Sequence, residues 1–232
     1  MTVPVLSASA ANALCADVPD SVYPDLHAVV FDVNVYLDVA SLVGPPFTWD
    51  KFQDAAARNA DAPLPNHADR RVDSLRAVSA CLEGRFAGPE RIEVWSSEHI
   101  DSLVVRKASQ PQNASTPELS GLGWAQTEAE SLLVDLVDDL VYEKTEGGSA
   151  TYVGVDGRPP LDHEDACVFT TALHAAGDAI PPSIKYCVTR DEQFRTATGL
   201  NSNVLVLYPD EFVSIVRRSR AALAMSAMRR TT

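Results

Sequence analysis

The sequence of 232 residues lacks the features that would place it in several large classes of protein. It contains no C-x-x-C pair, and its few cysteines are scattered, at Cys15, Cys81, Cys167 and Cys187. This argues against a zinc ribbon or a disulfide framework and favours a reduced, cytoplasmic protein. No apolar run approaches the roughly 18 residues that a membrane span requires, so we expect no membrane insertion. No lysine or arginine precedes Lys51, so we expect neither a secretory signal nor a basic nucleic-acid arm there.

The charge is strongly negative and unevenly distributed. The formal net charge is -13, which argues against a protein that binds nucleic acid mainly by counterion release. It remains compatible with an enzyme that gathers acidic side chains around cations. Nine of the 19 basic residues lie between Lys51 and Lys107 and five lie in the last 16 residues, whereas Glu118 to Glu146 contains eight acids and one lysine.

Short apolar runs alternate with segments of helical periodicity. The apolar runs predict strands at 28–31, 92–96, 184–188 and 204–207. The periodicity predicts helices at 68–82, 124–142 and 162–174, with others following Asp32 and Ser97 and beginning at Pro209. Loops are expected at 44–66, 109–123 and 147–160, the last with a small hairpin. This alternation predicts a three-layer α/β/α sandwich with a mostly parallel sheet.

We find no internal repeat and no domain linker. The sequence therefore predicts a leader at 1–24 and a single domain over 25–216, with insertions at about 44–90 and 109–123. An Arg-rich C-terminal tail is expected at 217–232.

Acidic residues occur where predicted strands end or predicted helices begin. They are Asp32, the pair Glu98 and Asp101, the group Asp162, Glu164 and Asp165, and Asp191. Ligands of parallel α/β sheets bind beyond the carboxyl ends of the strands, so we expect these acids to converge there. Convergent carboxylates repel one another unless a hard cation such as Mg²⁺ or Mn²⁺ neutralises them. The chemistry that this implies is metal-assisted phosphodiester hydrolysis.

Each of these acids also has a purely structural interpretation. Asp32, Asp162 and Asp191 fit helix N-caps, and Asp165 follows Asp162 at the spacing of a capping box. Glu98 and Asp101 would share one face of a helix, which a solvent-exposed face explains equally well. The five histidines show no metal-ligand spacing.

Five segments in the same order resemble the motifs of the PIN-domain family. The family's opening strand with D-x-N-V-x-L is similar to residues 30–37 (VFDVNVYL), and its second strand with a serine and an acidic helix to 94–101 (VWSSEHID). Its third acidic position and Ala-rich helix are similar to 162–166 (DHEDA) and 171–176 (TALHAA). Its V-T-x-D-x-x-F signature and last strand are similar to 187–194 (CVTRDEQF) and 204–212 (VLVLYPDEF). The resemblance spans about residues 28–216 with gaps.

The resemblance implies a Rossmann-like sandwich and a metal-dependent endoribonuclease site, which in many bacterial members belongs to the toxin of a toxin–antitoxin pair. Asp32, Asp165 and Asp191 would be metal ligands or acids that orient them. Asn34 would orient Asp32 or a water, and Thr189 would stand at the rim of the site.

The second acidic position departs from the family, which usually has a glutamate in this helix. Here Asp101 is the candidate ligand, with Glu98 as a substitute. Asp162 or Glu164 would assist Asp165. The cofactor expected is Mg²⁺ or Mn²⁺.

Basic residues in the 44–90 insertion are candidates for contacts with the substrate. They are Arg58, Arg70, Arg71, Arg76 and Arg85, of which we favour Arg70 and Arg71, together with Arg190 beside Asp191, as residues that bind RNA phosphates. A solvated helix face is the alternative.

Two further functions remain open. A haloacid-dehalogenase-like phosphatase also begins with a strand and D-x-D, but Asn34 stands where its second acid would be. A catalytically inert PIN-like scaffold would bind a protein partner. Besides RNA, the partners expected are a protein antitoxin and a second copy of the chain.

Overall fold

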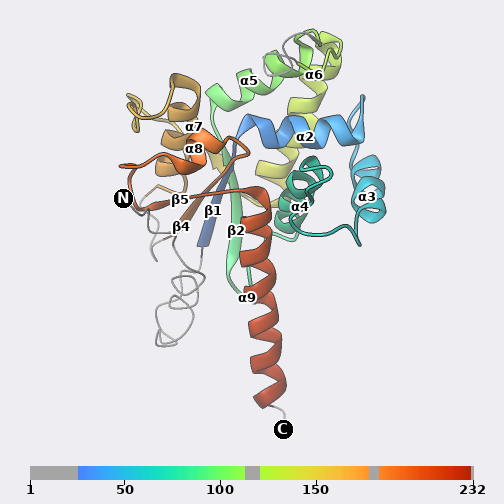
Figure 1. Ribbon diagram of the computed structural model, residues 1–232, viewed down its shortest axis with the longest axis vertical. Helices are drawn as coiled ribbons and strands as arrows, with labels where there is room; N and C mark the ends of the chain where they lie inside the picture. The colour runs from blue at the N-terminus through green and yellow to red at the C-terminus, as the bar shows by residue number, and fades with distance from the viewer. Residues whose placement is uncertain (1–25, 113–120, 178–182, 231–232) are drawn as a thin grey trace.

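The computed structural model describes residues 26–112, 121–177 and 183–230 and shows five parallel strands flanked by helices (Figure 1). The spatial order of the strands is β3-β2-β1-β4-β5. Their bounds are Leu26–Phe31 for β1, Arg91–Ser96 for β2, Gly148–Ser149 for β3, Ile184–Val188 for β4 and Val204–Leu207 for β5. The predicted leader at 1–24 and most of the 109–123 insertion lie outside the described residues.

The central position of β1 in the sheet explains why its sequence is continuously apolar. It pairs with β2 on one side and β4 on the other, with Val30 opposite Trp95 and Cys187. Both of its faces are covered, and every residue from His27 to Phe31 is buried. A strand buried on both faces needs no alternation of polar and apolar residues.

Helices cover both faces of the sheet. They are α2 (Val33–Val43), α3 (Trp49–Arg58), α4 (Arg71–Cys81), α5 (Glu98–Ser109), α6 (Gln126–Leu132), the π-helix η2 (Leu133–Lys144), α7 (His163–His174), α8 (Glu192–Thr196) and α9 (Pro209–Arg230). The chain crosses the sheet in one direction from β1 to β3 and returns in the other to β5. Right-handed crossovers therefore place α2 to η2 on one face and α7 and α8 on the other, a separation visible in Figure 1. The predicted α/β/α sandwich is confirmed.

Most predicted elements form, and the differences have local causes. The predicted loop at 44–66 contains α3, whose N-cap Thr48 accepts a hydrogen bond from the backbone of Lys51. The expected hairpin within 147–160 is wrong, because β3 pairs in parallel with β2. A Cβ atom at Gly147 would lie 1.8 Å from the Val94 carbonyl oxygen, so only glycine allows the chain to approach β2 this closely.

The last helix continues through the Arg-rich segment that the sequence analysis separates as a tail. Phe212, Val213 and Val216 of α9 are buried, whereas every side chain from 221 to 229 is exposed. Figure 1 shows this end of α9 extending away from the rest of the fold. Neither α9 nor any other helix in the described ranges has the length and apolar character needed to cross a membrane.

Candidate functional site

The candidate site lies at the carboxyl edge of the sheet, between β1 and β4. The chain reverses its direction across the sheet between these neighbours, and such a switch point is where open α/β sheets bind ligands. Asp32 follows β1 directly, and its backbone N–H donates to the Val188 carbonyl oxygen at 2.9 Å. Thr189 follows β4 and donates in the same way to Leu207 at 3.0 Å. Sheet pairing thus fixes the backbone on both sides of the switch point.

The Thr189 hydroxyl links two of the predicted acids. It donates a hydrogen bond to Asp32 Oδ2 at 2.7 Å and accepts one from the backbone N–H of Asp191 at 2.9 Å. Asn34 Nδ2 donates to the same Asp32 oxygen at 3.2 Å. Thr189 and Asp32 are both buried, so the rotamer of Asp32 is fixed by these contacts. Asn34 therefore lies where it can orient Asp32, whereas Thr189, expected at the rim of the site, is fully buried beside Asp32.

Asp165, from the first turn of α7, joins the same electrostatic group. Burial, followed by the charges of Asp32, Asp162 and Asp191, raises its pKa to about 7. The pKa of Asp32 is raised to about 6, mainly by burial and further by the charge of Asp191, although the Thr189 hydrogen bond lowers it. Acids from three separate segments therefore raise one another's pKa, and their mutual repulsion disfavours full ionisation.

Helix caps position the acids of α7 and α8. Asp162 Oδ1 accepts a hydrogen bond from the Asp165 backbone at 2.9 Å, and Asp191 Oδ1 accepts from Gln193 and Phe194 at 2.7 and 3.0 Å. The cap interpretation of Asp162 and Asp191 is thus confirmed. The cap bonds of Asp191 use one of its two carboxylate oxygens, and the other remains for a ligand.

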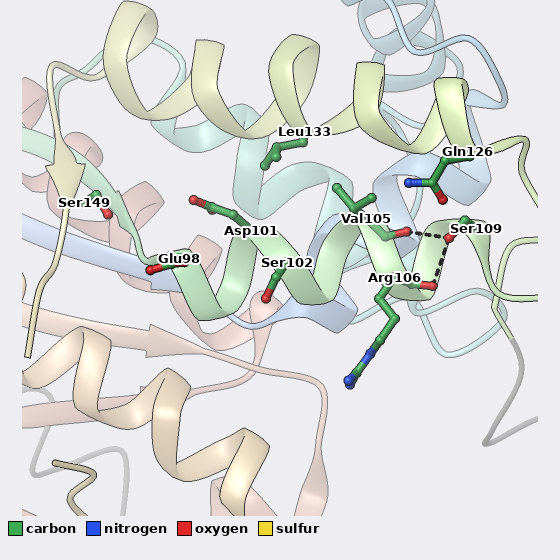
Figure 2. Close-up of a pocket in the computed structure, with 9 residues that line it drawn as sticks. All are labelled: Glu98, Asp101, Ser102, Val105, Arg106, Ser109, Gln126, Leu133 and Ser149. Carbon is green, nitrogen blue, oxygen red and sulfur yellow. Dashed lines mark hydrogen bonds between the residues drawn. The ribbon is translucent and has the colours of Figure 1, made fainter.

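Asp101 and Glu98 belong to a different group, on the first turn of α5. Both side chains line a hollow of about 670 Å³, and Figure 2 shows them on α5 among the other residues that line it. The Ser96 hydroxyl donates to Asp101 Oδ1 at 2.5 Å. Burial raises the pKa of Asp101, and the neighbouring charges that add to this are those of Asp138 in η2 and Glu98. The acids predicted to form one site are therefore divided between two groups.

Two of the arginines expected to bind substrate have partners inside the protein. Arg190 Nη1 forms a short ion pair with Asp38, a buried residue of α2. Arg71 pairs with Asp69 at 2.7 Å and also donates to the Ser41 hydroxyl. Arg70 is exposed immediately before α4.

The other basic side chains of the 44–90 insertion also divide into those with partners inside the protein and those that are exposed. Arg76 is buried and donates to carbonyl oxygens of the 59–63 loop. Arg85 donates to the Gly88 carbonyl oxygen, and Arg58 is exposed at the end of α3. Arg76 and Arg71 therefore stabilise loops, whereas Arg58 and Arg70 remain available to a phosphate.

Sequence reasoning missed two acids that act on predicted site residues. Asp38 holds Arg190 and accepts a hydrogen bond from Ser74 at 2.6 Å, and Asp138 provides the charge beside Asp101. Asp38 lies among apolar helix positions, where a carboxylate is buried only with a partner. That anomaly is a usable signal in the sequence, although it does not identify the partner.

The donors around Asp32 fit a hard cation by their chemistry. Asp32, Asp165 and Asp191 offer carboxylate oxygens, which Mg²⁺ and Mn²⁺ prefer. The neighbouring Cys187 thiol is buried, and burial and the charges of Asp32 and Asp165 raise its pKa, so it stays protonated. Burial and repulsion have already raised the pKa of Asp32 and Asp165, so a cation would remove an existing electrostatic cost. As placed in the described ranges, no three His, Cys, Asp or Glu side chains form a ready set of metal ligands.

Comparison with known proteins does not assign the chain to a family. Neither the protein-family models, nor the curated proteins, nor the solved structures gave a match.

Proposed function

We propose that the chain is a metal-dependent endoribonuclease of PIN type, with Asp32, Asp165 and Asp191 as the acids that hold Mg²⁺ or Mn²⁺. The observation that carries this proposal is the electrostatic group that these carboxylates form at the β1–β4 switch point. A role as the N-cap of α8 would by itself explain why an aspartate stands at position 191. Helix capping does not explain why the buried Asp32 follows β1, nor why its charge raises the pKa of Asp165 in α7.

The residues around the acids have separable tasks in this proposal. The bound ion would polarise a water and neutralise the charge that develops on the scissile phosphate. Thr189 and Asn34 hold Asp32 in one rotamer, and the backbone of Asp191 is held by the same threonine hydroxyl. Asp162 fixes the first turn of α7 and with it the backbone of Asp165. Glu164, the neighbour of Asp165, pairs with Arg106 at 2.5 Å, so it ties α7 to α5.

RNA is proposed as the substrate from the resemblance to PIN domains. The phosphates of any nucleic acid would approach an acidic edge, where the exposed Arg58 and Arg70 are the candidate contacts from the insertion.

The direct test is cleavage of a labelled RNA oligonucleotide with Mg²⁺ or Mn²⁺ and with EDTA. We expect Asp32→Asn and Asp165→Asn each to lose at least about a hundredfold in rate, because even groups that only orient metal ligands contribute about 10- to 100-fold. Asp54→Asn, an exposed carboxylate of α3, is the matched control and should retain full activity. Cleavage that survives EDTA, or an Asp32→Asn variant as active as the parent, would refute the proposal.

The same samples address the alternatives. An inert scaffold would cleave nothing with either ion. A phosphatase of the haloacid-dehalogenase type would instead form a phosphoaspartate on Asp32, which mass spectrometry detects.

A further inference from the structure

The outer half of α9 exposes a face that is both apolar and basic. Met225 and Arg229 lie seven and eleven positions after Arg218, so a helix with 3.6 residues per turn carries these three side chains on one side. All three are exposed, and Met225 keeps 57% of its surface accessible. No Asp or Glu follows Glu211 in the sequence, whereas five arginines do, so this end of the helix is positively charged.

The opposite side of the same helix is held against the fold. Arg220 donates to the carbonyl oxygens of residues 85 and 86, and a Cβ atom at Gly88 would lie only 2.7 Å from Leu223. These contacts fix the direction of α9, and Figure 1 shows its free end pointing away from α3. The open face that carries Met225 is therefore presented away from the body of the chain.

A hollow between α3 and η2 has the complementary character. Its volume is about 530 Å³, and two exposed apolar side chains, Val134 and Tyr142, are among those that line it. It is also lined by four carboxylates, which are those of Asp135, Asp138, Asp139 and Glu143. None of the described residues that line it is basic.

The wall of this hollow already holds one cation. The Lys144 ammonium group lies 5.5 Å from the centroid of the Trp49 ring and 3.5 Å from Asp139. An aromatic face beside a carboxylate attracts cationic side chains, and arginine stacks on such faces more often than lysine does. Lys144 offsets one of the four negative charges, so the hollow stays negative and suits further basic side chains.

We propose that the open face of α9 docks into this hollow on a second copy of the chain. Met225 would cover Val134 and Tyr142, so that exposed apolar surface is buried on both copies. Arg218 and Arg229 would meet the carboxylates of η2, which fixes the orientation of the helix by charge complementarity. The proposal is independent of the nuclease proposal, because the acids at the β1–β4 switch point take no part in it.

Direction and charge favour a second copy over other occupants. The α9 of the same chain points away from α3 (Figure 1). Two α9 ends paired with each other would place arginines against arginines, which is repulsive. RNA would use the arginines but would leave Met225 exposed. A helix end in a hollow makes a small interface, so we expect a weak, salt-sensitive association and not a permanent dimer.

Sedimentation velocity of the full chain over a range of micromolar concentrations, in low and in high salt, measures this association. The α9 variant is Arg218→Glu, Met225→Glu, and the hollow variant is Val134→Lys, Glu143→Lys. All four side chains are exposed in the wild type, so both variants should fold. We expect each variant alone to associate at least about tenfold more weakly than the wild type, because like charges then meet in the interface.

Mixing the two variants tests whether the two surfaces bind each other. The α9 variant keeps an intact hollow and the hollow variant keeps an intact α9, so the mixture should associate at least about tenfold more tightly than either variant alone. Arg58→Glu and Glu130→Lys are the matched controls. They reverse exposed charges outside both surfaces, so their association should stay within about twofold of the wild type.

Three results would overturn the proposal. They are a wild type that stays monomeric in low salt, a hollow variant that associates as tightly as the wild type, and a mixture that stays dissociated. A monomeric wild type whose affinity for RNA is lost in the α9 variant would assign this face to RNA instead. None of these results depends on RNA cleavage, so failure of the nuclease proposal is recognised separately.

Discussion

Replacing Asp165 by asparagine should stabilise the metal-free protein at neutral and alkaline pH. In the folded protein, burial and four neighbouring acids raise the pKa of Asp165 from 3.8 to about 7. Between about pH 4 and pH 7 the folded state therefore retains a proton that the unfolded chain has released. The free energy of unfolding falls with rising pH over that interval, and above pH 7 the whole penalty is present.

The size of this penalty follows from the pKa shift and the exposure of the side chain. A shift of about three units corresponds to roughly 4 kcal/mol at about 1.36 kcal/mol per unit. Asp165 is only half-buried, and solvent screens part of the repulsion, so we expect about 1–2 kcal/mol. Asparagine keeps the shape and carries no charge. It should gain this amount relative to the wild type at pH 8 and almost nothing near pH 4.

Urea denaturation in EDTA at pH 4.5, 6 and 8, followed by tryptophan fluorescence, measures this difference. With a typical urea dependence of about 2–3 kcal/mol per molar, the midpoint of Asp165→Asn should exceed the wild type by about 0.5 M at pH 8. Asp54→Asn is the control and should show no such pH dependence. In Mn²⁺ at about 100 times its dissociation constant, the wild type would gain about 2.7 kcal/mol and the order should reverse. A difference between Asp165→Asn and wild type that is the same at pH 4.5 and 8 would refute the electrostatic argument.

Two further predictions concern the contacts that hold the β4 exit. Thr189→Val removes the donor to Asp32 and the acceptor for the Asp191 backbone, so we expect the free energy of unfolding to fall by about 2 kcal/mol and the pKa of Asp32 to rise above 6 in a ¹³C carboxyl NMR titration. Thr189→Ser should restore the stability and the pKa. An unchanged pKa in Thr189→Val would contradict the role of the hydroxyl. Arg190→Ala leaves the buried Asp38 with Ser74 as its hydrogen-bond partner and should lower the free energy of unfolding by roughly 2–3 kcal/mol. Adding Asp38→Asn should recover part of that loss. Strictly additive effects in this double-mutant cycle would show that the ion pair contributes nothing.

The sheet and its acidic edge could be predicted because both follow from short-range patterns. Four of the five strands are apolar runs, and the acids after them must lie at one edge once the strands are parallel. The two-residue strand β3 left no such pattern, because its position depends on the close approach of Gly147 to Val94.

The division of the acids into two groups was not predictable from the sequence. The motif that contains Asp101 follows the motif of Asp32 along the sequence. The face of α5 that carries Asp101, however, lies beside η2. Only the packing of η2 brings Asp138 to Asp101, across 37 positions of sequence. The same limit applies to Arg190, whose partner Asp38 lies 152 positions away. Local spacing identifies candidate acids, and tertiary packing decides which of them repel one another.

The use of the arginines sharpens the argument for a cation. The sequence suggested that a basic insertion offsets the acidic site, but Arg71, Arg76 and Arg190 are engaged by groups inside the protein. Arg220 of α9 is likewise engaged, by the carbonyl oxygens of residues 80, 85 and 86. The charges that act on Asp32 and Asp165 are those of other carboxylates. A phosphate can approach such an edge only if something else supplies positive charge, and a divalent ion held by Asp32, Asp165 and Asp191 would do so at the point where the chemistry is proposed to occur.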